Sequence, residues 1–387
     1  MQGNLNRVQV YLDYAATTPM KPVALQAWVN AASIIGNPSG AHKAARIAKD
    51  ALEEARENTA SLLGVQARQV VFTSGGTESD NTAIFGSARG DSLILCSAIE
   101  HHAVLDPVER LGGCAIGVTS GGVLDLTQLE DTLRVRGDSV GLISIMTVNN
   151  ETGVVQPLAA VHKLAKRYAP SALLHTDAVQ APSYLDVSIL TREFDLVSLS
   201  GHKFGGPKGV GILVVKDPER IKPLIFGGGQ EWELRSGTPN LAGIVSMAAA
   251  LRDAVENREF NVRHVSDLTE LLRSGLSDKF NNIQVNGGEE IQMCNISNYC
   301  FEGLNSEEIL FLLDAAGVYA SAGSSCASGA LNPSHVLLAM GKSKTAAKGS
   351  LRLSLGPETT ESEIGYAVDV IGNVVTDLAS KKGLGCI

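Results

Sequence analysis

Short apolar runs alternate with amphipathic helical patterns between about residues 70 and 215, and this alternation constrains the fold more than any other feature. The runs have the length and apolar content of buried strands, and they fall at 70–73, 92–96, 141–148, 172–176 and 194–200. After Pro157, which suits the first turn of a helix, apolar residues recur at intervals of three and four. Such alternation predicts an α/β protein with a mainly parallel sheet and helices on both of its faces.

The pattern changes beyond about residue 260. Strands are expected near 295–299, 318–321 and 351–355, with a helix over 306–316. Thr360 and Glu363 form a capping box, which predicts the start of the last helix. A chain of 387 residues is long enough for two domains. We therefore expect a large domain over 15–260 and a smaller α+β domain made of 1–14 and 261–387.

Composition and charge exclude several classes of function. A net charge of -9 and an aromatic content of 5% give no basic or stacking surface for nucleic acid. The first ten residues lack the pattern of a signal peptide, and no run approaches the roughly 20 apolar residues of a membrane span. We expect a cytoplasmic protein. The six cysteines include no Cys-x-x-Cys pair, so no metal site is expected.

One lysine stands directly after a predicted strand. The apolar run 194–200 is followed by Gly201-His202-Lys203 and a glycine-rich turn. Ligands of open α/β sheets bind beyond the carboxyl ends of the strands. A lysine shielded from water there loses part of its preference for the charged form, and a neutral amine can form a Schiff base. The alternative is an ordinary solvated lysine, as most lysines are.

Other polar residues follow neighbouring strands. Ser74-Gly75-Gly76-Thr77 follows the strand at 70–73 and opens a helix, which suits a phosphate cradle or an ordinary capped turn. His101 follows the strand at 92–96, where an imidazole can stack on an aromatic cofactor, move protons or cap a helix; of His101 and His102, only one is expected to do so. Asp177 follows the strand at 172–176, where a carboxylate can hold a pyridinium nitrogen or cap a helix.

Taken together, several stretches resemble the cysteine desulfurases of the NifS/IscS type, which are pyridoxal 5'-phosphate (PLP) enzymes of the aminotransferase class V group. The resemblance runs in order from about Tyr11 to about Val374. It rests on Ser74 to Asn81, Glu100-His101, Val148 to Gly153, Asp177 to Gln180, Ser200 to Gly211, Arg235 to Pro239 and Ser321 to Ser328. It implies a large PLP-binding domain of fold type I, the aspartate aminotransferase-like fold, and a smaller domain that carries a catalytic cysteine loop.

The resemblance also implies a role for individual residues. Lys203 would carry PLP and His101 would stack on its ring; both are expected to be catalytic. The remaining cofactor contacts would come from Gly76, Thr77, Asn150, Asp177, Gln180, Ser200 and His202, and from Thr238 of a second subunit, which implies a homodimer. The substrate carboxylate would bind Asn37, Asn150 and Arg352, because a planar guanidinium suits bidentate contact with a carboxylate.

Cys326 occupies the nucleophile position of the family. The implied reaction converts L-cysteine to L-alanine and leaves the sulfur as a persulfide on Cys326, for delivery to an iron–sulfur scaffold or another sulfur carrier. Cys386 is the rival carrier, and Cys96, Cys114, Cys294 and Cys300 are expected to be buried and inert. Three alternatives stay open at this point, namely a selenocysteine lyase, a class V aminotransferase, and a PLP-binding regulator or scaffold without catalysis.

This sequence departs from the family pattern in places. Gly40 stands where a serine is usual, Trp232-Glu233 replaces a more common Arg-Gly pair, and His102 follows His101 where related chains vary. The chain ends at Ile387, so we expect it to lack much of the extension with which some relatives dock an iron–sulfur scaffold.

Overall fold

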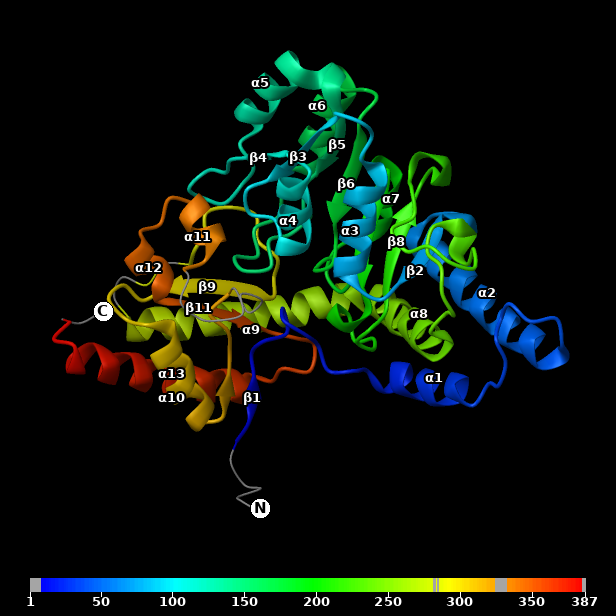
Figure 1. Cartoon of the computed structure of the whole chain (residues 1–387). Coiled ribbons are helices and arrows are strands. Elements are labelled where there is room, and N and C mark those ends of the chain that lie inside the picture. The colour runs from blue at the N-terminus through cyan, green and yellow to red at the C-terminus, as the bar shows by residue number, and fades with distance from the viewer. Residues whose placement is uncertain (1–7, 281–282, 284, 324–332, 385–387) are drawn as a thin grey trace.

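A seven-stranded sheet forms the centre of the molecule. The computed structural model describes residues 8–280, 283, 285–323 and 333–384. The order of the strands across the sheet is β2-β8-β7-β6-β5-β3-β4 (Figure 1). Their bounds are Val70–Thr73 for β2, Leu93–Ser97 for β3, Cys114–Ile116 for β4, Val140–Ser144 for β5, Leu173–Asp177 for β6, Leu196–Ser200 for β7 and Gly211–Val215 for β8.

The sheet is mainly parallel, as the sequence predicts, but β8 is antiparallel to both of its neighbours, β2 and β7. The pairs from β7 across to β4 are all parallel. A parallel neighbour needs a long crossover connection, usually a helix. The link from β7 to β8 is only residues 201–210, which turn through Gly201–Lys203 and run straight back. This short link both reverses β8 and leaves Lys203 beside the end of β7.

Helices cover both faces of the sheet. Successive strand residues alternate between two apolar cores, so that Val70 and Phe72 face one core while Val71 faces the other. The helices α3 and α4 contribute to the second core and α2, α5, α6 and α8 to the first. The helices of this part are α1 (Pro22–Ala32), α2 (Lys43–Leu63), α3 (Gly76–Ser87), α4 (His102–Arg110), α5 (Leu126–Arg136), α6 (Leu158–Tyr168), α7 (Val187–Glu193) and α8 (Leu241–Glu256).

The beginning and the end of the described chain share a third core. Val10 and Leu12 pack there with apolar residues from 265 to 378. The strand β1 (Val10–Tyr11) pairs in parallel with β10 (Val318–Tyr319), and β11 (Ser350–Ser354) pairs antiparallel with β9 (Ile296–Cys300). The helices α9 and α13 lie along this region in Figure 1. The helices here are α9 (Arg258–Lys279), α10 (Ser306–Ala315), α11 (His335–Ala339), α12 (Lys344–Lys348) and α13 (Glu361–Lys381).

The expected boundary near Phe260 falls in the first turn of α9, and only Asn257 separates α9 from α8. The division into domains at 260 therefore stays a prediction. The capping box of Thr360 and Glu363 is present and begins α13. None of the described helices combines the length and the apolar character that a membrane crossing would require.

Candidate active site

A cavity of about 290 Å³ lies beyond the carboxyl ends of the central strands. It gathers the sequence-predicted site residues of the described chain, apart from Asn37 and Thr238. The predicted residues that line it are Gly76, Thr77, His101, Asn150, Asp177, Gln180, Ser200, His202, Lys203 and Arg352. The sheet explains this convergence, because β3, β5, β6 and β7 are parallel and deliver their last residues to one edge.

The ammonium group of Lys203 is held by the backbone near the start of the chain. Its Nζ donates a hydrogen bond to the carbonyl oxygen of Ala15. The amide Nε2 of Gln180 donates to the same oxygen at 3.0 Å. Ala15 is buried. One backbone carbonyl from the segment before α1 thus positions two of the predicted site residues.

Asp177 ends β6 with its carboxyl group buried. Its Oδ1 accepts a hydrogen bond of 2.9 Å from the backbone N–H of Val179. Burial raises the pKa of Asp177 to about 6, while that hydrogen bond and the charge of Lys203 act in the opposite direction. A buried carboxyl group that still ionises near neutral pH is suited to pair with a protonated ring nitrogen.

His101 stands at the start of α4 with a defined proton position. Its Nδ1 accepts a hydrogen bond of 3.1 Å from the backbone N–H of Ala103, so the neutral ring carries its hydrogen on Nε2. Burial, and then the positive charge of Lys203, lower the pKa of His101 to about 4. The imidazole is therefore neutral near neutral pH, and Nε2 is its donor.

His102 lines the cavity as well as His101, and the expectation that only one of the two stacks on a cofactor or moves protons stays a prediction. His102 is the first residue of α4 and lies at the mouth, where its Nδ1 is 3.1 Å from a carboxylate oxygen of Asp106. Its ring centroid is 4.8 Å from that of His335, which lines the same cavity. Because a helix starts between them, both imidazoles reach one opening.

A second hollow adjoins the cavity at the start of α3. Gly75, Gly76, Thr77, Ser200 and His202 line it, and Lys208 is a further cation beside it that the sequence did not point to. The first N–H groups of a helix have no intrahelical partner and favour an anion. The close approach also requires glycine, since a Cβ on Gly76 would lie 2.9 Å from the Val179 side chain. The donor set suits a phosphate group.

Arg352 is buried in the cavity wall and makes several fixed contacts. Its Nη2 donates to Asp13 at 2.6 Å, and its Nη1 donates to the carbonyl oxygens of Asn150 at 2.9 Å and Gly323 at 3.3 Å. The Nε of Arg352 is buried without a hydrogen-bond partner. An orphaned donor on a guanidinium that lines a cavity suits a carboxylate ligand.

Two predicted residues lie elsewhere in this chain, and a third is not described. Asn37 is exposed, and its Oδ1 accepts a hydrogen bond of 3.0 Å from the N–H of Ser39. Thr238 is exposed beside a separate hollow that Ser74 and Arg235 also line. Cys326 lies outside the described residues, as does Cys386.

Sequence reasoning missed several cavity residues. Ala15 lines the cavity and Asp13 contacts Arg352, and both belong to a short segment before α1 whose sequence carries no strong motif. Glu151 lines the cavity and accepts a 2.5 Å hydrogen bond from the hydroxyl of Ser334. Glu151 directly follows the predicted site residue Asn150, and this position in the sequence was the only feature that pointed to it.

The expectation that the four described cysteines are buried is confirmed at Cys96 and is wrong at the other three positions. Cys96 is buried, as expected, and Cys294 and Cys300 are partly exposed, but Cys114 is exposed. It begins β4, a strand of three residues at the edge of the sheet, and no other strand of the described residues pairs with the outer side of β4. Among the described residues no group of three or more His, Cys, Asp or Glu side chains is arranged to hold a metal ion.

Comparison with known proteins decides the family. The family model of aminotransferase class V matches residues 10–366. The chain belongs to the aminotransferase class V family. It is 39% identical to the IscS-like cysteine desulfurase of Mycobacterium tuberculosis, over 94% of this chain and 96% of that protein. A solved NifS-like protein matches with a TM-score of 0.89 and 35% identity, over 96% of this chain and all of that one.

A further solved structure is also similar to this chain. SspA, solved in complex with cysteine, matches with a TM-score of 0.78 and 33% identity, over 91% of this chain and 100% of that chain. As a class V enzyme, the chain uses PLP. The residues present fit that cofactor, because the hollow at Gly76 suits its phosphate while Lys203 and Asp177 line the adjoining cavity.

Proposed function

We propose that this class V enzyme is a cysteine desulfurase, which converts L-cysteine to L-alanine and transfers the sulfur to its own Cys326. The observation that carries the proposal is the single cavity that holds Lys203, Asp177 and Arg352 beside a phosphate-sized hollow. The relatives named as cysteine desulfurases and the likeness to SspA in complex with cysteine support the choice of substrate.

The proposed roles in holding PLP follow the contacts. Gly76, Thr77, Ser200 and His202, with Thr238 of a second subunit, would bind the phosphate. Asp177 would pair with the pyridine nitrogen, Gln180 and Asn150 would contact the ring oxygen, and His101 would stack on the ring. Bound in this way, PLP withdraws electrons from the substrate Cα.

The chain's own groups would then move protons and sulfur. Arg352, with Asn150 and with Asn37 of either subunit, would bind the substrate carboxylate. Lys203 would take the Cα proton as a neutral amine, and Nε2–H of His101 is a donor already in place. The Cys326 thiolate would attack the substrate sulfur while the Cβ–S bond breaks. The carbon keeps the electron pair of that bond and gains a proton to become alanine, and Cys326 becomes a persulfide.

A homodimer is part of this proposal. Thr238 lies away from the cavity of its own subunit, which fits a role in the neighbouring one. The helix α1 also exposes a set of large apolar side chains that a second subunit would cover. These are Val23, Leu25, Trp28 and Val29.

The proposal extends to the division of the chain and to its location. A large PLP-binding domain over 15–260 and a small domain of 1–14 and 261–387 fit the separate apolar cores. The four described cysteines are free thiols, which fits a cytoplasmic enzyme in a reducing compartment. The sulfur acceptor would be a protein, either an iron–sulfur scaffold or another carrier.

The deciding experiment compares the wild type with Cys326→Ser. The wild type should release alanine from L-cysteine and carry a persulfide that peptide mapping assigns to Cys326. The variant should keep the yellow cofactor colour and form neither product. Near-normal alanine release by the variant, or a persulfide mapped first to Cys386, would contradict the proposal.

Keto-acid-dependent amino transfer faster than sulfide release would favour an aminotransferase, and preferred turnover of selenocysteine would favour a selenocysteine lyase. Binding of PLP without any turnover would favour a regulator or scaffold.

A further inference from the structure

A buried ion pair anchors the loop that follows β8 to the central sheet. The guanidinium of Arg56, on α2, forms two hydrogen bonds with the carboxylate of Glu231, at 2.7 and 2.8 Å. The same carboxylate accepts the backbone N–H of Phe72 at 2.8 Å, and Arg56 donates to the carbonyl of Val70 at 2.8 Å. Arg56 is 2% exposed. Breaking a pair so deeply buried is costly, which makes it a firm anchor.

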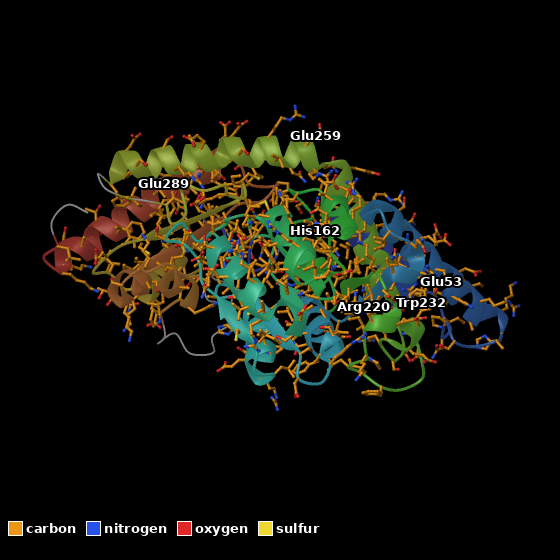
Figure 2. All side chains as sticks on the ribbon, turned by 90° about the horizontal axis from the view of Figure 1, so that it is seen from above. Glu53, His162, Arg220, Trp232, Glu259 and Glu289 are labelled. Carbon is orange, nitrogen blue, oxygen red and sulfur yellow. The ribbon has the colours of Figure 1, made fainter. Side chains whose placement is uncertain are left out.

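Two aromatic rings pack against the guanidinium of this pair. The centre of the Arg56 guanidinium is 4.7 Å from the ring centroid of Phe72 and 4.4 Å from that of Trp232. Figure 2 labels Trp232 close to Glu53, which also contacts Arg56 at 3.2 Å.

The backbone of this loop is strained at three consecutive residues. Glu231, Trp232 and Glu233 all have positive φ, at 49°, 54° and 64°. They are the only described residues other than glycine with positive φ. Left-handed backbone is unfavourable for such side chains and persists where surrounding contacts impose it. Arg56 contacts the first two of these residues, Glu231 and Trp232.

The other end of the loop reaches the phosphate hollow. Two nitrogens of Arg235 contact the carboxylate of Glu78, at 2.9 and 3.3 Å. Glu78 accepts the backbone N–H of Ser74 at 2.8 Å, and both Ser74 and Glu78 line the hollow at the start of α3. The loop is therefore fastened at Arg56 and, four residues after Glu231, fastened again to the turn that precedes Gly76.

We propose that Arg56 is a positioning residue for the cofactor phosphate, acting through Glu231, the loop and the Arg235–Glu78 pair on the turn at Ser74 to Thr77. This inference rests on the proposed PLP site. Arg56 does not line either hollow, so it touches no ligand. Its effect is on the geometry of the N–H groups that would face the phosphate, and therefore on phosphate affinity rather than on affinity for the ring.

Comparing PLP with pyridoxal, which lacks the phosphate, isolates that effect. The cofactor-free full chain is titrated with each compound, and binding is followed by visible absorbance. Arg56→Met should lower the affinity for PLP about tenfold, which is the size of effect seen when a supporting contact is lost in metal sites. The affinity for pyridoxal should stay within about twofold of the wild type. Trp232→Ala, which removes the half-buried ring that stacks on Arg56, should lower PLP affinity about threefold, roughly 0.65 kcal/mol.

Arg273→Met is the control, because Arg273 is a partly buried arginine that is likewise hydrogen-bonded, to Ser297 and Gln292, away from both hollows. Its ratio of PLP to pyridoxal affinity should equal that of the wild type. Equal losses of affinity for PLP and for pyridoxal in Arg56→Met would overturn the inference. A wild-type ratio of PLP to pyridoxal affinity in Trp232→Ala would also overturn it, even if Arg56→Met fails to fold. A wild type that binds neither compound would instead overturn the proposed function.

Discussion

The carboxylate of Asp13 and the guanidinium of Arg352 lie 2.6 Å apart in the cavity wall, although 339 residues separate them in the chain. The pairing of β1 with β10 and the isolated bridge between Asp13 and Ser354 bring the two segments together. Asp13 and two carbonyl oxygens fix the plane of the guanidinium, and Nε remains without a partner. These contacts hold Arg352 in one orientation in the cavity wall.

Arg352→Lys should therefore impair substrate binding while sparing the cofactor. A lysine keeps the charge but loses the planar fork and its bidentate contact. We expect KM for L-cysteine to rise about 10- to 100-fold, which corresponds to about 1.4–2.7 kcal/mol. Visible absorbance of bound PLP should be unchanged, and steady-state alanine production gives KM. Arg273→Lys is the control, and an unaltered KM in Arg352→Lys would remove Arg352 from the substrate site.

Lys203→Ala tests the proposed attachment of the cofactor. Lys203 lines the cavity with Asp177, so it is the amine placed for covalent attachment. Borohydride treatment of the wild type should fix PLP to Lys203, detected by peptide mass spectrometry, and the variant should give no fixed adduct. Lys216→Ala, which changes a lysine just beyond β8, should still give it. An adduct on a different lysine in the Lys203 variant would refute the assignment.

The pH dependence of the protein's stability should reflect the burial of His175, which lies two residues before Asp177 on β6. His175 is fully buried on β6, with hydroxyl partners Ser144 at 2.8 Å and Ser198 at 2.9 Å. Burial lowers its pKa to about 3. An unfolded histidine has a pKa of about 6.5, so the folded state binds fewer protons over the range between these values. The stability that neutral His175 contributes is complete above about pH 6.5 and is lost as pH falls toward 3.

Urea titrations at several pH values measure this effect. Between about pH 6 and 4, His175 should account for up to about 1.4 kcal/mol of lost stability per pH unit. His175→Gln should show a correspondingly shallower fall than the wild type, whatever its absolute stability. His101 and His202 act in the same direction, since burial is the largest cause that lowers each of their pKa values to about 4. Equal slopes in the variant and the wild type would contradict the expectation.

Local sequence pattern predicted the sheet and the residues that follow its strands, because strand ends at one edge converge by topology alone. Lys203, Asp177 and His101 were found in this way. Pattern could not predict that β8 runs antiparallel, since the direction depends on the ten-residue link at 201–210. Nor could it predict Asp13, whose role exists only because β1 pairs with a strand some 300 residues later. The expected strand 141–148 is shorter in the structure and ends at Ser144, although Ile145 and Thr147 still donate backbone hydrogen bonds to His175 and Asp177 of β6.

Glycine substitutions at two neighbouring residues of the strained turn, Trp232 and Glu233, should change the stability of the protein in opposite directions. Glu233 has φ 64° and an exposed side chain. A left-handed conformation costs a residue with a Cβ about 1–2 kcal/mol, and the greater freedom of unfolded glycine offsets about 0.5–1 kcal/mol of the gain. Glu233→Gly should therefore stabilise the protein by about 0.5–1 kcal/mol, measured as a higher urea midpoint.

Trp232→Gly relieves the same backbone strain, at φ 54°, but removes the ring that stacks 4.4 Å from the Arg56 guanidinium. The lost cation–π contact is worth about 0.5–1 kcal/mol, and the half-buried ring contributes about 1–2 kcal/mol more through its apolar area. These losses exceed the relief of strain, so the urea midpoint should fall. A lower midpoint for Glu233→Gly would show that its side chain stabilises the turn. A higher urea midpoint for Trp232→Gly would show that stacking of the ring on Arg56 stabilises the protein by less than the left-handed backbone at this residue destabilises it.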